Sequence, residues 1–212
     1  MNPIRVLAGI IASLHDEDGR ITVPGFYDGV TDLPEAVRAQ WQALAFDHRK
    51  FLGEVGLSVP AGEHDRTPLE MLWSRPTCDV NGIWGGYTGA GFKTVLPSQA
   101  HAKISFRLVP GQDPHRLRDN FRNHVRTMVP FDCQVAFHEH GASAASVMDI
   151  SDPAFEAARA ALGQEWGRPA SYVGCGGSIP IAGYFRSILD MDAMLIGFGR
   201  DDDQIHSPNE KY

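Results

Sequence analysis

A histidine in an acid-flanked loop near the end of the chain is the residue best suited to metal chemistry. His206 follows the apolar stretch 193–198 and lies between the acidic run 201–203 and Glu210. A neutral imidazole is a good zinc ligand, and a nearby carboxylate such as Glu210 can orient the ring. A histidine in a polar loop can equally be an ordinary solvated residue, and a zinc site needs three or four ligands. Both interpretations stay open on local chemistry alone.

A glycine turn offers a second kind of site. The stretch 174–180 reads Gly-Cys-Gly-Gly-Ser-Ile-Pro, with Ser178 near the N-cap and Pro180 in the first turn of a predicted helix. Free backbone amides and the helix dipole there favour an anion, although a capped turn without a ligand is the alternative. Ser178 is not in a Gly-x-Ser-x-Gly elbow, so a serine nucleophile is not indicated. Cys175 has no neighbouring histidine, which predicts a buried, unreactive thiol.

The stretch 100–108 alternates as a half-buried strand, with one apolar face made by Ala102, Ile104, Phe106 and Leu108. Arg107 therefore points away from the apolar layer, where its guanidinium could bind a carboxylate through two hydrogen bonds. A solvent-facing arginine is the simpler alternative. His140 follows a predicted strand at 133–138 and could be a surface or a site residue.

Composition narrows the class of protein. The 212 residues are 43% hydrophobic and 21% charged, which suits one large domain or a domain with an appendage. The formal net charge of -7 argues against a nucleic-acid partner. No apolar run approaches the roughly 18 residues of a membrane span, so no membrane partner is expected. The three cysteines are far apart and fit neither a disulfide framework nor a thiolate zinc site, which favours a reducing cytoplasm.

The spacing of apolar residues and of capping signals predicts an α+β fold, with a sheet that carries helices on one face. The order strand, strand, helix, strand between residues 77 and 138 supports this fold class. Predicted helices are 4–15, 34–52, 67–74, 113–128, 153–163 and 179–189, and predicted extended segments are 21–27, 79–84, 100–108, 133–138, 171–173 and 193–198. The glycine-rich turn at 173–178 is the best domain boundary. The abrupt start in a helix and the loop at the other end lead us to expect truncation at both ends.

Five ordered segments together resemble family twenty of the metallopeptidases, which includes carnosinases, cytosolic dipeptidases, aminoacylases and desuccinylases. The segments are 81–87, 93–97, 102–110, 176–180 and 202–211, with sequences NGIWGGY, KTVLP, AKISFRLVP, GGSIP and DDQIHSPNEK. The resemblance runs over essentially the whole chain. One departure is Cys175, at a position where many dipeptidase relatives carry glutamate.

The resemblance implies a specific fold and specific roles. Residues 1–173 would form the lid and dimerisation domain, a ferredoxin-like four-stranded antiparallel sheet with helices on one face. Residues 174–212 would be a short helix-strand piece of the α/β catalytic domain. His206 would be a zinc ligand, and Gly177 and Ser178 would meet the substrate near the hinge. Four lid residues would also reach the substrate, some across the dimer: Asn81, Thr94, Arg107 and His140.

The implied activity is hydrolysis of a peptide or N-acyl amide bond next to a free carboxylate, with two zinc ions, or manganese or cobalt instead. The remaining ligands and the general base would lie upstream in a longer parent. The 212-residue chain alone is therefore expected to be inactive and metal-free, and to pair with itself as a homodimer. A free-standing dimerisation or ligand-binding module without chemistry is the competing hypothesis. Which dipeptide or acylated amino acid is cleaved stays open.

Overall fold

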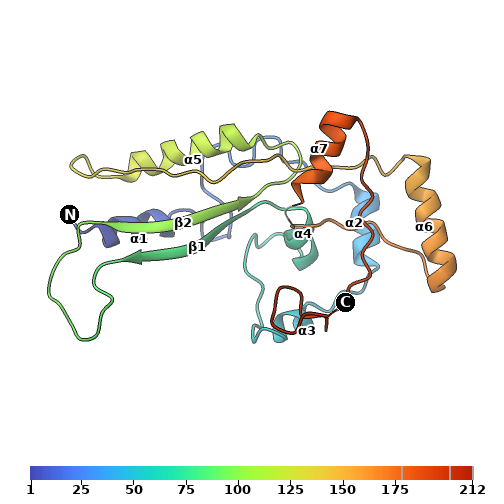
Figure 1. Ribbon diagram of the computed structural model, residues 1–212, viewed down its shortest axis with the longest axis horizontal. Coiled ribbons are helices and arrows are strands. Elements are labelled where there is room, and N and C mark those ends of the chain that lie inside the picture. Colours follow the sequence, from blue (N-terminus) through green and yellow to red (C-terminus); the bar gives the residue numbers. More distant parts are fainter. Residues whose placement is uncertain (178, 201, 212) are drawn as a thin grey trace. The chain divides into compact units, whose positions relative to one another are not determined.

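A computed structural model describes residues 1–177, 179–200 and 202–211 (Figure 1). Its described residues divide into two compact units, which are treated separately below. Unit 1 comprises residues 1–147 and 170–180, and unit 2 comprises residues 148–169 and 181–212. The elements in chain order are α1 (Pro3–Ala12), α2 (Glu35–Gln42), α3 (His48–Gly53), α4 (Pro68–Trp73), β1 (Thr77–Gly85), β2 (Ala100–Arg107), α5 (Pro114–Met128), α6 (Pro153–Trp166) and α7 (Pro180–Leu189).

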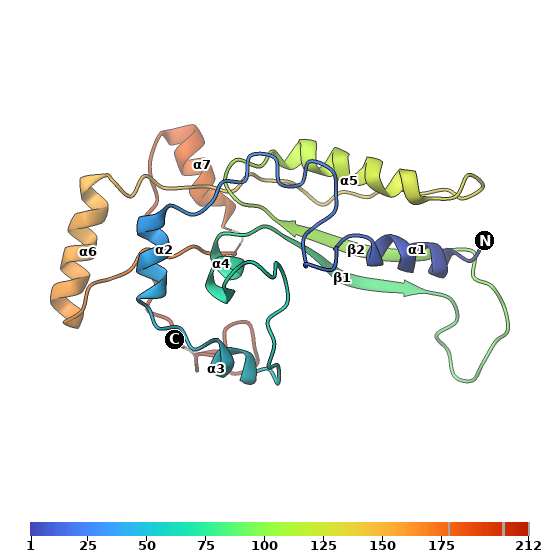
Figure 2. The same cartoon turned by 180° about the vertical axis from the view of Figure 1, so that it is seen from behind.

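The sheet of unit 1 pairs β1 with β2 in antiparallel fashion, from Thr77 opposite Arg107 to Gly85 opposite Ala100. Helices α1 and α5 contact each other, and α1 lies along β2 (Figure 1 and Figure 2). The rings of Phe106 on β2 and Phe121 on α5 meet edge to face, with centroids 5.1 Å apart. Helices thus cover the apolar face of the sheet, and the predicted α+β class is confirmed.

The core of unit 1 collects apolar side chains from the first thirty residues, from β1 and from α5. Its buried members are Leu14, Ile21, Val23, Phe26, Cys78 and Leu117. Ile104, Phe106 and Leu108 pack against this cluster, as the alternation in 100–108 predicted. Burial raises the pKa of the Cys78 thiol to about 12, which keeps it protonated and unreactive. Because Ile104, Phe106 and Leu108 face the core, the alternate residues of β2 point to the opposite, polar face of the sheet.

The described residues form a two-stranded sheet, whereas four strands were expected. Residues 133–138 and 193–198 do not belong to a ladder. In the segment 21–27, Ile21 forms one isolated β-bridge with His15. The chain then turns, because Pro24 has no amide proton to donate and Gly25 has a positive φ of 70°. Alternation shows that a segment is extended, but hydrogen-bond pairing depends on a partner elsewhere in the chain.

Capping signals placed two helices correctly. Thr67 and Glu70 form a reciprocal capping box at the start of α4. Asp113 accepts hydrogen bonds from two backbone amides at the start of α5. The continuous helix predicted over 34–52 is wrong, because α2 ends at Gln42 and Asp47 caps a separate helix, α3. Helix α2 has no side-chain cap, and the nearby Asp32 carboxylate lies 3.0 Å from the Arg66 guanidinium in an ion pair.

A buried ion pair stabilises the middle of unit 1. Arg75 donates two hydrogen bonds to the Glu63 carboxylate, one with Nη2 2.9 Å from Oε1, and the two side chains are 7% and 5% exposed. Burial alone would raise the pKa of Glu63, but hydrogen bonds from Arg75 and Tyr27 hold it below its ordinary value. Burial also raises the pKa of Tyr27 to about 12, so its hydroxyl stays protonated.

Unit 2 contains α6, most of α7 and the loop that carries His206. Asp152 caps α6, and Gly167 ends it with a positive φ of 66°. The rings of Trp166 and Phe198 lie 6.1 Å apart and both are largely exposed. None of the helices in the described part of the chain is long and apolar enough to cross a membrane.

Candidate functional site

The predicted lid residues lie along the polar face and the loops of the sheet in unit 1. Arg107 ends β2 opposite Thr77, and its side chain is exposed. Asn81 lies at a bulge between Val80 and Gly82, four residues farther along β1 than Thr77. At about 3.3 Å per residue, roughly 13 Å separates these two positions along the strand. The two side chains therefore cannot contact one small group together, but they can line an extended substrate-binding surface.

The bulge decides which residues share this polar face. Because Asn81 has no partner on β2, the side-chain alternation of β1 shifts there by one residue. Trp84 therefore lies on the same face as His101, and their rings stack at 4.9 Å. The Lys103 ammonium lies 5.9 Å from the centre of the Trp84 ring. Sequence reasoning missed these three residues, although the polar positions 101, 103, 105 and 107 of β2 were a signal for them.

Thr94 and His140 lie in connections rather than in the sheet. Thr94 is exposed in the segment between β1 and β2. His140 is also exposed, and the residues before it are held against α5. The Glu139 carboxylate lies 2.5 Å from the Arg118 guanidinium and 3.2 Å from that of Arg122. These bonds join the Glu139 side chain to α5, and the neighbouring His140 side chain is exposed.

The segment that was expected to carry substrate contacts at the hinge belongs to unit 1. We call residues 171–177 the return segment. Gly177 is exposed, and its amide donates to the Cys175 sulfur at 3.4 Å. Cys175 is itself exposed, so the prediction of a buried thiol is wrong. The helix predicted after the turn is confirmed as α7, which begins at Pro180, but Ser178 lies outside the described residues and its capping role stays a prediction.

The loop of unit 2 that carries His206 is held by its own acidic residues. The buried Asp203 carboxylate accepts the Arg200 amide at 2.7 Å, and the Asp203 carbonyl accepts the Lys211 amide at 2.9 Å. Glu210 accepts the backbone amide of His206 at 3.1 Å, so it holds the main chain there and not the ring. His206 has a positive φ of 63° and an exposed side chain.

This geometry fits one metal ligand and no more. An exposed imidazole on a fixed backbone can coordinate a cation whose other ligands come from elsewhere. Among residues 1–177, 179–200 and 202–211, no group of three His, Cys, Asp or Glu side chains could hold a metal ion. Because a zinc site needs at least three protein ligands, His206 can only complete a site that other residues begin.

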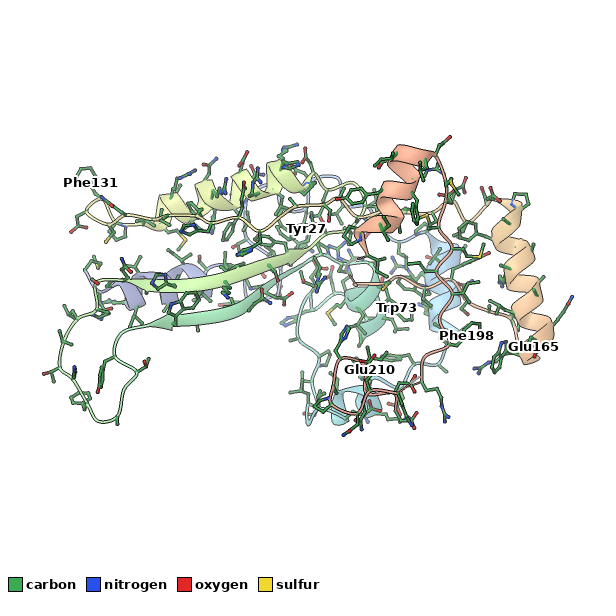
Figure 3. All side chains as sticks on the ribbon, viewed as in Figure 1. Tyr27, Trp73, Phe131, Glu165, Phe198 and Glu210 are labelled. Carbon is green, nitrogen blue, oxygen red and sulfur yellow. The ribbon has the colours of Figure 1, made fainter. Side chains whose placement is uncertain are left out.

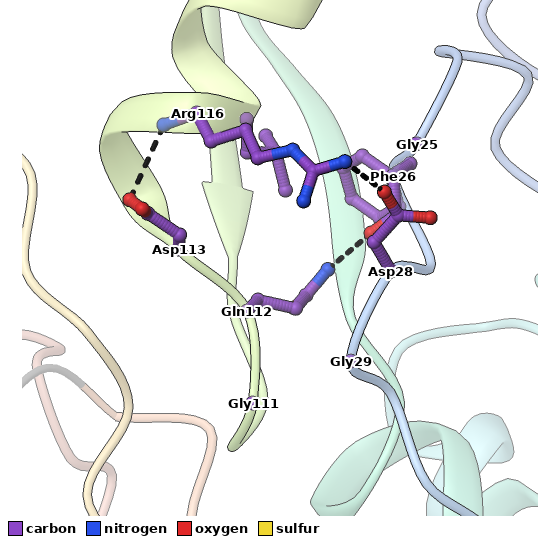
Figure 4. A pocket seen from close by; sticks show the side chains of 9 residues that line it. Gly25, Phe26, Asp28, Gly29, Gly111, Gln112, Asp113 and Arg116 are labelled. Atoms are coloured by element: carbon purple, nitrogen blue, oxygen red, sulfur yellow. Dashed lines mark hydrogen bonds and ion pairs between the residues drawn. The ribbon is translucent and has the colours of Figure 1, made fainter.

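A cavity of about 190 Å³ in unit 1 is lined by none of the predicted site residues (Figure 4). Gln112 donates to the Phe26 carbonyl at 2.6 Å, and Arg116 lies 2.6 Å from the Asp28 carboxylate. Gly29 and Gly111 approach so closely that a Cβ on either would lie 2.1 Å from the carbonyl oxygen of the other. Because these groups bind one another, we interpret the cavity as part of the packing between α5 and the loop before α2.

The similarity to known proteins extends over residues of both units. Residues 1–133 match the family model described as the peptidase dimerisation domain of the M20 peptidases. The chain is 30% identical over 214 residues to the Cys-Gly metallodipeptidase DUG1 of Candida albicans, and 31% identical over 219 residues to the human Beta-Ala-His dipeptidase. Each alignment covers 99% of this chain but only 44% and 42% of the relative.

A solved structure agrees over the same extent. The M20 family metallo-carboxypeptidase Sso-CP2 of Sulfolobus solfataricus superposes with a TM-score of 0.84 and 29% identity, over 99% of this chain and 48% of that protein. The chain thus spans less than half the length of these relatives. Because the family model matches more than half of the chain, and the similarity to M20 peptidases continues through the His206 loop, the chain belongs to the M20 peptidase dimerisation domain family.

Proposed function

We propose that this chain is the lid and part of the catalytic domain of a dinuclear-metal peptidase. The substrate would be a dipeptide or an N-acyl amino acid, cleaved next to a free carboxylate. The observation that carries the proposal is the alignment with metallodipeptidases over 99% of the chain, through both the dimerisation domain and the loop of His206. A free dimerisation module would need only the first of these two parts.

The proposed division assigns residues 1–173 to the lid and residues 174–212 to the catalytic domain. Exposed apolar side chains in the second part support this assignment, since a soluble domain rarely leaves so many uncovered. On α7 and after it, at least half of the side chain is exposed at Ile181, Tyr184, Ile188, Leu189, Met191, Leu195 and Phe198. The rest of a catalytic domain would cover them. The ferredoxin-like four-stranded sheet is part of the same proposal, and β1 and β2 are its strands among the described residues.

The chemistry assigns each exposed site residue a task. When bound, two zinc ions polarise the scissile carbonyl and activate water. His206 supplies one imidazole to that centre. The Arg107 guanidinium binds the free carboxylate of the substrate, with the turn at Gly177 and Ser178 as a second anchor. Asn81, Thr94 and His140 contact the remaining polar groups of the substrate.

The lid is also proposed to form a homodimer. Both strands of the described sheet have a free edge, and exposed edges are usually covered by another chain or element. Sedimentation of the protein at micromolar concentration should give the mass of two copies. The three free cysteines, with no disulfide among the described residues, support a cytoplasmic location.

The test uses the longer protein that contains this chain, with the His206→Ala variant beside the wild type. Wild type is expected to hydrolyse dipeptides only when metal is present. His206→Ala should lose bound metal and at least about a hundredfold in kcat/KM, because a metal ligand is removed. His64→Ala is the matched control, since His64 is an exposed loop histidine of unit 1 without a proposed role. Full activity and full metal content in His206→Ala would contradict the proposal.

A further inference from the structure

Both backbone polar groups of one residue in the return segment are bound by side chains of α2. The Tyr172 amide donates to Gln40 Oε1 at 2.9 Å, and the Tyr172 carbonyl accepts from Trp41 Nε1 at 2.9 Å. Trp41 is buried at 5% exposure. Backbone groups of an extended segment usually find their partners on a neighbouring strand. Here α2 takes the place of that strand.

The next residues of the return segment rest on the backbone of α4. A Cβ on Gly174 would lie 2.2 Å from the carbonyl oxygen of Trp73, and a Cβ on Gly176 would lie 3.3 Å from that of Leu72. Only glycine permits the first of these approaches. The Trp73 ring, labelled in Figure 3, meets the Trp41 ring edge to face with centroids 5.1 Å apart. Residues 172–176 therefore pack against a surface formed by α2 and α4 together.

We propose that Gln40 and Trp41 are positioning residues for substrate binding. They fix the backbone that leads directly into Gly177, so this residue keeps its place relative to the other substrate contacts of unit 1. This inference rests on the proposed function, because it takes Gly177 as a substrate contact. Displacements of about 1 Å, even when caused by changes distant from the chemistry, can cost about a hundredfold in rate.

The variants separate hydrogen bonding from packing. Gln40→Met removes the acceptor and keeps the length of the side chain, whereas Gln40→Glu keeps an acceptor oxygen. Trp41→Phe removes the indole N–H and keeps an aromatic ring against Trp73. Gln42→Met is the matched control, because Gln42 lies on the same helix with an exposed side chain. All four changes are made in the longer protein.

The first measurement is amide hydrogen exchange over residues 172–177, which needs no activity. Exchange should become about five- to tenfold faster in Gln40→Met and Trp41→Phe, as expected for the loss of one hydrogen bond. It should stay at the wild-type rate in Gln40→Glu and Gln42→Met. Unchanged exchange in both Gln40→Met and Trp41→Phe would overturn the anchoring of the return segment.

The second measurement is steady-state hydrolysis of a dipeptide by the metal-loaded enzyme. Gln40→Met and Trp41→Phe should raise KM about tenfold, whereas a smaller folded fraction would lower only kcat. Gln40→Glu should restore the wild-type KM. Faster exchange combined with a wild-type KM would overturn the positioning role while leaving the proposed function intact. A wild-type enzyme that hydrolyses neither a dipeptide nor an N-acyl amino acid would instead overturn the proposed function and the positioning role together, and exchange would still decide the anchoring.

Discussion

The two units differ in how much of their own apolar surface they bury. Unit 1 encloses a core around Leu14 and Phe26, each only 1% exposed. In the described part of unit 2, the buried apolar residues are Phe155 and Ala182, and the segment after α7 leaves Phe198 52% exposed. Hydrophobic burial is the main source of folding free energy. Unit 1 therefore gains more folding free energy from its own buried apolar core than unit 2 does from Phe155 and Ala182.

The largest expected effect comes from removing a ring in each unit of the 212-residue chain. Phe26→Ala should lower the free energy of unfolding by about 3–5 kcal/mol, because it opens a cavity in the core. Phe198→Ala should lower it by less than about 1 kcal/mol, because the ring is half exposed. Urea unfolding followed by far-ultraviolet circular dichroism measures both.

The same pair of variants in the longer protein sharpens the comparison. If a catalytic domain covers unit 2, Phe198→Ala should there approach the cost of a core substitution. Equal and small costs for Phe198→Ala in both settings would show that nothing covers this side chain. A large cost already in the 212-residue chain would break the contrast between the units.

A second contrast sets a buried ion pair against an exposed one. Glu63→Gln should cost about 3 kcal/mol, because it leaves Arg75 buried without a charged partner. Asp192→Asn in unit 2 should cost less than about 1 kcal/mol, because its partner Arg186, 2.7 Å away, is half exposed to solvent. Chemical denaturation at neutral pH measures both differences.

The Glu63 contrast also has a predicted pH dependence. The pKa of Glu63 is lowered in the folded protein, so folding favours its ionised form. Its contribution to stability is therefore fully present above the ordinary glutamate value of 4.5 and is lost as the pH falls through the lower folded value. The difference between wild type and Glu63→Gln should shrink in that acid range. A difference that grows on acidification would contradict the assigned ion pair.

The smallest effect comes from a methyl group added to one glycine in each unit. Gly174→Ala should cost about 1–3 kcal/mol, because the new Cβ would collide with the Trp73 carbonyl. Gly197→Ala should change stability by less than about 1 kcal/mol, since nothing lies within 4 Å of the added atom. Thermal unfolding of both variants provides the comparison. Equal shifts in Tm would argue against close packing of the return segment on the backbone of α4.

Local signals made part of this fold predictable. The capping box of Thr67 and Glu70 and the Asp113 cap lie within one helical turn, so the sequence shows both partners together. Asp47 was a similar signal that was overlooked, and it would have revealed the break between α2 and α3. The alternation of β2 correctly gave its buried face, since side-chain direction in a strand is also a local property.

The long-range contacts could not be predicted in this way. Trp41 and Tyr172 are 131 residues apart, and no spacing within α2 shows which backbone its indole binds. The Arg75 partner of Glu63 and the lack of ladder pairing at 133–138 in the described residues are equally invisible in local spacing. Among the site residues, Arg107 was placed correctly on the polar face, whereas the shared aromatic face of Trp84 and His101 depends on a bulge that alternation alone does not reveal.

The most direct test of the account is zinc titration of the 212-residue chain by calorimetry, combined with a dipeptide hydrolysis assay. This chain has one proposed metal-ligand histidine, so we expect no tight stoichiometric zinc binding and no hydrolysis. The longer protein should show both. Tight binding of two zinc ions with hydrolysis by the 212 residues alone would contradict it.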